Sequence, residues 1–263
     1  MSKNIRFFFI FILGFISYYL FDLFYFKTIQ NFSKNIFHSK ALAHVTAYSV
    51  TLIPLIITLK VLLPQKNILT LFSLNKPIIK GFTPAFIGTL PMLIGYSIHF
   101  KAISKINVET LFINTLSSAF FEEIIFRAFL IGIIYRFTRL GFLSSALSGS
   151  LLFAQVHLYQ SQNITVLAEI FAITFLGSIF FAWVYFESEY NLWTAIFLHF
   201  FMNLYWEIFD VSENVSGNFY GNLYKVCSIV VMIILIIHLK RKNKSPFEIK
   251  CKDLFIKTRE VQS

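Results

Sequence analysis

The sequence predicts an all-α fold, a polytopic membrane helix bundle with about eight transmembrane helices. Of the 263 residues, 57% are apolar, 19% are aromatic and only 14% are charged. This composition is far from that of a soluble domain and typical of a polytopic membrane protein. The net charge is +10, but the basic residues lie between apolar runs and in the tail. We therefore expect the lipid bilayer as a partner, and no nucleic acid.

Apolar runs of about 17–25 residues predict helices that cross the bilayer. Eight such runs follow one another along the chain. Prolines at positions 54, 84 and 91 fall inside or at the start of two of them, where neighbouring helices can satisfy the freed carbonyls. The runs cover residues 5–26, 41–63, 82–100, 109–135, 141–158, 164–186, 192–209 and 223–239. We expect three connected regions, residues 1–108, 109–209 and 210–263.

The distribution of basic residues predicts the orientation of the chain in the membrane. With eight spans, both termini lie on the same side, and that side holds the basic tail that begins at Lys240. Cytoplasmic segments carry the excess of lysine and arginine in membrane proteins. We expect a multi-pass protein of the cell membrane with both termini in the cytoplasm.

The fourth run contains two acids and a base, in the stretch Glu122-Glu123-x-x-x-Arg127. On a helix, Glu123 and Arg127 are four residues apart and lie on one face, with the acid before the base, which is the favourable order for an ion pair. Glu122 lies about 100° away and has no local partner. Because an unpaired acid inside a membrane is a functional candidate by default, we predict a structural ion pair beside one functional acid.

Two later runs carry histidines at helical spacing. Phe153 precedes His157 by one helical turn, and His199 precedes Asn203 by the same spacing. Each has a structural alternative, because a lone histidine near a helix end is often an interfacial residue and a His–Asn pair can hold two helices together. A lone acid, Glu169, near the start of the sixth run either reaches the interface or carries protons.

Together, Glu122, His157, His199 and Asn203 form a polar set that fits hydrolysis. A carboxylate and a histidine that share a water act as a general base, and a second histidine with an amide can stabilise an oxyanion. The set contains no serine or cysteine, which favours direct attack by water over a covalent intermediate. A zinc ion on Glu122, His157 and His199 is an alternative, although the HExxH signature is absent.

These motifs, in this order on successive apolar runs, resemble the CPBP family. It contains the type II CAAX prenyl proteases (Abi class) and bacteriocin-processing or bacteriocin-immunity enzymes. The resemblance covers roughly residues 111–206, within the region 109–209, and includes the run Tyr190-Asn191-Leu192-Trp193-Thr194-Ala195-Ile196 before His199. The first three spans and the basic tail carry no diagnostic motif.

The resemblance implies an intramembrane endopeptidase that cleaves a membrane-associated peptide or protein. By position, Glu122 and His157 would activate water, and His199 and Asn203 would stabilise the oxyanion. Both a metalloprotease and a metal-free glutamate mechanism remain open, as do CAAX-like, leader-peptide and propeptide substrates. The alternative is a non-enzymatic membrane protein, either a transporter or a bacteriocin-immunity protein that acts by binding. Against transport, the sequence has no inverted repeat.

Overall fold

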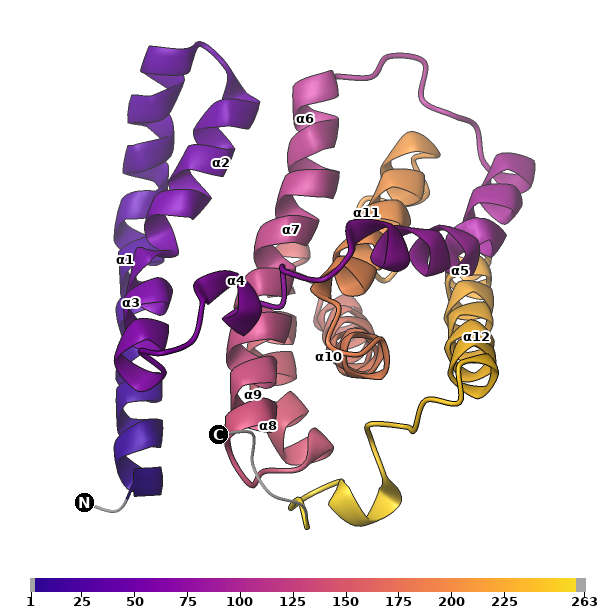
Figure 1. Cartoon of the computed structure of the whole chain (residues 1–263). Coiled ribbons are helices and arrows are strands. Elements are labelled where there is room, and N and C mark those ends of the chain that lie inside the picture. Colours follow the sequence, from indigo (N-terminus) through magenta and orange to yellow (C-terminus); the bar gives the residue numbers. More distant parts are fainter. Residues whose placement is uncertain (1–2, 259–263) are drawn as a thin grey trace.

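The computed structural model describes residues 3–258, and all regular structure in this range is helical (Figure 1). The predicted all-α class is therefore confirmed. In chain order the helices are α1 (Lys3–Phe37), α2 (Lys40–Thr51), α3 (Ile53–Leu62), α4 (Ile68–Leu71), α5 (Ile78–His99), α6 (Val108–Phe112), η1 (Ile113–Ser117), α7 (Ser118–Glu122), η2 (Glu123–Ile133), α8 (Ile134–Phe137), α9 (Phe142–Gln155), η3 (Leu158–Gln160), α10 (Ile164–Glu187), α11 (Leu192–Ile208), α12 (Phe219–Lys242) and η4 (Cys251–Asp253).

Five helical stretches in this range are long and apolar enough to cross a membrane: Asn4–Phe37, Lys40–Leu62, Ile78–His99, Ile164–Glu187 and Phe219–Lys242. They correspond to five of the eight predicted spans, and a polytopic helical bundle is the architecture. In the other three runs, α9 and α11 have 14 and 17 residues, fewer than the roughly 20 that a straight span needs. The remaining run, 109–135, alternates between α and π turns. The count of eight stays a prediction.

Two boundaries differ from the prediction for physical reasons. Helix α1 continues to Phe37, because Lys27, Gln30, Asn31 and Lys34 recur at helical spacing and form a polar stripe rather than a stop signal. The second run is divided at Leu52 into α2 and α3. Pro54 lacks a backbone N–H and cannot complete the helical hydrogen bonds at this point.

The helical run from α6 to α8 lies at the centre of the fold and carries the two adjacent acids. In Figure 1 it stands between α1–α3 on one side and α5, α11 and α12 on the other. All eleven residues of η2 are buried. The central run contains two π-helical segments, η1 and η2, which lie on either side of the short helix α7. Glu122 is the last residue of α7. Such π turns are rare in proteins, and many of those known lie at functional sites.

The chain beyond α12 folds back against the bundle. The Glu187 carboxylate at the end of α10 pairs with Lys240 Nζ at 2.8 Å and accepts the backbone N–H groups of Glu248 and Ile249 at 3.1 and 2.9 Å. The backbone N–H of Gly141 donates to the carbonyl of Phe255 at 2.7 Å. A Cβ at Gly141 would lie 2.3 Å from the carbonyl oxygen of Asp253, so this contact requires glycine. The tail is thus a packed segment as well as a basic flank.

Candidate functional site

Glu123 forms the buried ion pair that the sequence predicts. Its Oε1 lies 3.1 Å from Arg127 Nη1, and the two side chains are 0% and 1% exposed. The guanidinium also lies over two aromatic rings, 4.1 Å from the centroid of Phe153 and 5.2 Å from that of Phe181. A carboxylate and two π faces therefore compensate the charge of Arg127 where water cannot.

His199 joins this pair from helix α11. Its Nδ1 lies 2.8 Å from Glu123 Oε1. Because a carboxylate accepts hydrogen bonds, the imidazole presents an N–H at Nδ1, and its Nε2 points away from Glu123. Glu123 thus holds the ring orientation of His199 in addition to pairing with Arg127, a contact across helices that the spacing of the sequence did not indicate.

Glu122 faces the other nitrogen of the same imidazole. Its Oε2 is 4.0 Å from His199 Nε2, and the Glu122 side chain is 20% exposed. Within residues 3–258, Glu122 Oε2 is buried and has no hydrogen-bond partner. Glu123 Oε2 is likewise buried without a hydrogen-bond partner among residues 3–258. The two acids differ in their contacts: Glu123 Oε1 holds Arg127 and His199, whereas Glu122 only approaches His199.

His157 lies just beyond the end of α9, at the start of the short η3 turn. Its Nδ1 is 2.6 Å from the carbonyl oxygen of Phe153, and the two rings are 4.4 Å apart between centroids. The Phe153 ring also lies 6.4 Å from that of His199, so one aromatic ring is close to both histidines. The predicted Phe153–His157 contact is present.

Asn203 lies one turn after His199 but has a different partner. Its amide Nδ2 donates to the backbone carbonyl of Asn114 in η1 at 3.1 Å. The Asn114 side chain in turn donates to Glu207 Oε1 at 3.3 Å. The amide that the sequence predicts for the site is therefore anchored to the π segment before Glu122, and Asn114 is a site neighbour that the sequence did not reveal.

The three side chains that the sequence offered as possible zinc ligands do not form a ligand cluster among residues 3–258. Over residues 3–258, no three His, Cys, Asp or Glu side chains lie close enough together to hold a metal ion. Glu122 and His199 approach each other to 4.0 Å, but His157 does not join them in such a group. The set Glu122, His157 and His199 does not fit a three-ligand site in this arrangement. Glu169 is exposed on α10.

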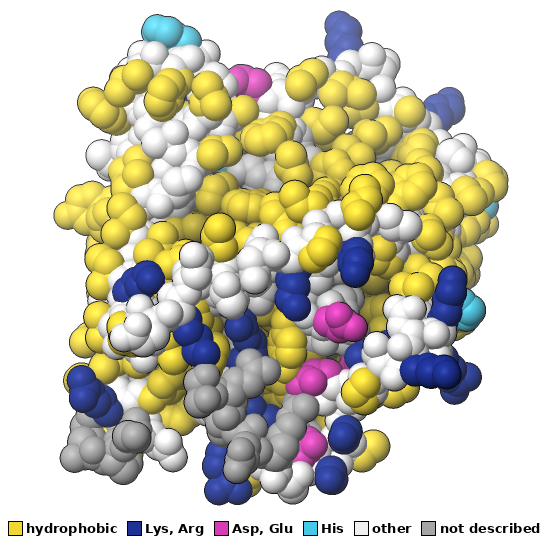
Figure 2. Space-filling model, viewed as in Figure 1, with side chains coloured by type: hydrophobic (Ala, Val, Ile, Leu, Met, Phe, Trp, Pro, Cys, Tyr) yellow, Lys and Arg dark blue, Asp and Glu magenta, His cyan; other side chains and the backbone are white. Residues whose placement is uncertain are grey.

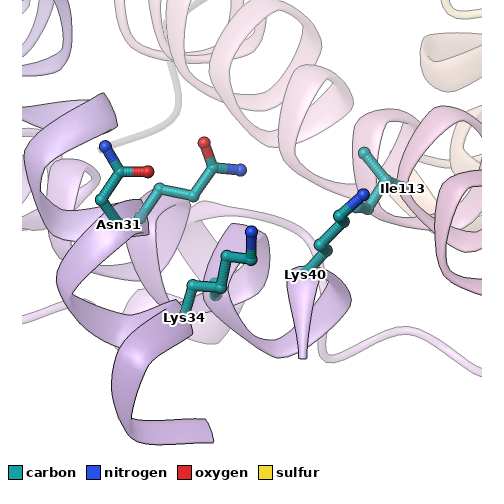
Figure 3. A pocket seen from close by; sticks show the side chains of 6 residues that line it. Asn31, Lys34, Lys40 and Ile113 are labelled. Carbon is teal, nitrogen blue, oxygen red and sulfur yellow. The ribbon is translucent and has the colours of Figure 1, made fainter. Parts of the chain in front are cut away.

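A cavity of about 210 Å³ lies away from the acids, between the end of α1, the start of α2 and η1 (Figure 3). Two amides and two lysines line it, together with two apolar side chains: Gln30, Asn31, Lys34, Lys40, Ala43 and Ile113. No acid or histidine is among these residues, so the cavity offers cationic and hydrogen-bonding groups rather than a base.

Sequence reasoning missed one further acid inside a span, Asp22 on α1. Its Oδ1 is buried and has no hydrogen-bond partner among residues 3–258, while its carboxyl group interacts with the side chain of Thr51 on α2. A lone acid in the run 5–26 was the available signal. It has the same intramembrane character that singled out Glu122.

Residues 105–205 match the family model described as Type II CAAX prenyl endopeptidase Rce1-like. The match coincides closely with the segment 111–206 that carries the motifs, and it contains Glu122, His157, His199 and Asn203. It confirms the resemblance drawn from these residues. No curated protein and no solved structure shows a significant match to the chain.

Proposed function

We propose that Glu122 activates a water molecule that hydrolyses a peptide bond of a membrane-associated substrate. The premise is the match of residues 105–205 to the family model of type II CAAX prenyl endopeptidases. The observation that carries the proposal is the contrast between adjacent acids. Glu123 contacts both Arg127 and His199 through Oε1, whereas Glu122 only approaches His199 Nε2 at 4.0 Å, beyond hydrogen-bond distance. The Oε2 atoms of both acids are buried without a hydrogen-bond partner among residues 3–258. An unpaired carboxylate inside a membrane protein has a high free-energy cost, so its presence indicates a functional residue.

The separation of Glu122 and His199 suits one shared water. Their facing atoms are 4.0 Å apart, too far for a direct hydrogen bond. A water about 2.8 Å from each would meet them at an angle of about 90°, within the range of ordinary water geometry. Because the Nδ1–H of His199 donates to Glu123, the Nε2 lone pair of a neutral His199 is available to this water.

In the proposed reaction, the water oxygen attacks the carbonyl carbon of the scissile peptide and its proton passes to Glu122. The tetrahedral intermediate then collapses, the C–N bond breaks, and Glu122 returns the proton to the leaving amine. The products are a new carboxylate and a new amine. General acid–base catalysis of this kind contributes typically 10²–10⁴-fold in rate.

His157 and Asn203 take supporting roles in the proposal. With Nδ1 of His157 directed at the carbonyl of Phe153, its Nε2 is the nitrogen left to accept a proton. The Asn203 amide has a second N–H beyond the one that Asn114 accepts. We assign His157 to water activation beside Glu122 and Asn203 to the developing oxyanion. His199, whose Nδ1–H is held by Glu123, positions the water through Nε2.

The bilayer supplies the setting of the reaction. Figure 2 shows apolar side chains over most of one face, with many of the basic side chains gathered near the end where α1 begins and the tail lies. Since lysine and arginine concentrate on the cytoplasmic side, this distribution supports a cytoplasmic location of both termini. The substrate is then a peptide or protein that reaches the site from the membrane or its surface.

Comparative sequencing of peptide termini tests the proposal. Membranes that contain wild-type protein are compared with membranes that contain equal amounts of Glu122→Gln protein. We expect new termini in the wild-type sample that the variant does not produce. Glu169→Gln, which changes an exposed acid outside the cluster, is the control and should cleave like wild type. Identical sets of termini with wild type and Glu122→Gln would refute a proteolytic role for Glu122.

A further inference from the structure

Helix α2 packs along the central helix in a register that brings Tyr48 to the neighbourhood of Glu122. His44 Nδ1 lies 2.9 Å from the Ser117 hydroxyl. One helical turn later on both helices, the Tyr48 ring stacks on Phe121 with centroids 4.7 Å apart and an interplanar angle of 11°. Phe121 is the residue directly before Glu122. Two contacts at the same spacing on both helices fix this register.

The Tyr48 ring is held firmly, and its hydroxyl is not used by the fold. Besides Phe121, the rings of Phe26 and His44 pack against it at 4.8 and 4.9 Å between centroids. No hydrogen bond to the Tyr48 hydroxyl occurs within residues 3–258. The hydroxyl lies within electrostatic range of two carboxylates, Glu122 and Asp22. The phenol is therefore fixed in place with a free O–H near the proposed base.

The proposed reaction needs donors that the known motif residues supply only in part. The Nδ1–H of His199 is committed to Glu123, and one N–H of Asn203 is committed to the Asn114 carbonyl. A tetrahedral oxyanion is stabilised by two or more donors aimed at the carbonyl oxygen. A tyrosine hydroxyl is a good donor for this purpose because its position is set by a rigid ring.

We propose that Tyr48 is a further catalytic residue, whose hydroxyl donates a hydrogen bond to the carbonyl oxygen of the scissile peptide as the tetrahedral intermediate forms. The inference rests on the proposed function. It extends the active site beyond the matched segment 105–205 into α2, so the N-terminal helices are part of the reaction centre. No bond to Tyr48 forms or breaks, since the hydroxyl gives only a hydrogen bond.

The test uses purified full-length protein and a quenched-fluorescent peptide that spans a cleavage site found in the comparison of termini. Tyr48→Phe removes one oxygen and keeps the ring that packs on Phe121. We expect kcat to fall about 10²–10³-fold, the cost of losing one oxyanion donor, while KM and the melting temperature stay at the wild-type values. Tyr19→Phe, which changes an exposed tyrosine on α1, is the matched control and should keep full activity.

Three results would overturn the inference. Wild-type kcat in Tyr48→Phe would exclude a catalytic hydroxyl. A raised KM with unchanged kcat would make Tyr48 a residue of ground-state binding. A loss of activity that follows a loss of melting temperature would make it structural. In each of these cases the wild-type enzyme still cleaves the peptide and Glu122→Gln does not, so the proposed function stands. A wild-type protein that cleaves no peptide would refute the proposed function itself.

Discussion

Replacing Arg127 with alanine removes the cation from the most buried polar contact of the site. Glu123, which is fully buried, then keeps only His199 as a charged or polar partner. Removing one partner of a buried ion pair costs about 3–5 kcal/mol. The loss of the guanidinium above Phe153 and Phe181 adds to this, since a desolvated cation–π contact contributes about 2 kcal/mol. We expect a low yield and a clearly lower melting temperature.

Melting temperature and turnover, measured on the same preparation, separate stability from chemistry. Activity of Arg127→Ala per folded molecule should stay within the range of the wild type, so that any loss follows the loss of folded protein. Arg127→Lys should recover part of the stability, because lysine keeps the charge but lacks the planar group that stacks on the rings. A variant Arg127→Ala that melts like wild type and has no activity would refute the reasoning and assign Arg127 to the reaction.

Three further predictions concern the neighbours of this pair. The double variant Glu123→Gln with Arg127→Gln should be more stable than Arg127→Ala, because no charge stays unpaired. Its kcat should fall below that of the wild type, because His199 loses the carboxylate that orients it. A wild-type kcat would contradict this role of Glu123. Elemental analysis of active protein should find less than one zinc per chain. One zinc per chain, together with loss of cleavage when a chelator removes it, would contradict a reaction without metal. Glu187→Gln should weaken the contacts that hold the tail, because the carboxylate pairs with Lys240 and accepts the N–H groups of residues 248 and 249. Amide hydrogen exchange at residues 248–249 should then be faster than in the wild type. Unchanged exchange would show that other contacts hold the tail.

The sequence predicted the features that depend on local spacing. The ion pair of Glu123 with Arg127 follows from a four-residue separation on one helix, and the structure contains it. The contact of Phe153 with His157 has the same origin. The apolar runs predicted the helical membrane bundle, although the structure does not decide the count of eight spans.

The features that depend on contacts between helices could not be predicted in this way. Local spacing offered Asn203 as the neighbour of His199, whereas packing brings Glu123 to that histidine and Asn114 to the asparagine. The π turns that bracket Glu122 have no residue signature in this chain. In the sequence, Tyr48 is one of many aromatic residues in apolar runs. Its contact with Phe121 depends on the packing register of α2 against the central helix.

The most direct test of the account is turnover by purified Glu122→Gln protein. The substitution keeps the size of the side chain and removes a carboxylate that has no hydrogen bond to lose at Oε2 within residues 3–258. We expect a melting temperature close to that of the wild type, since the substitution keeps the volume and breaks no ion pair at hydrogen-bond distance. We also expect kcat to fall by at least about 10²-fold. Peptide cleavage at the wild-type rate by folded Glu122→Gln protein would contradict the central claim.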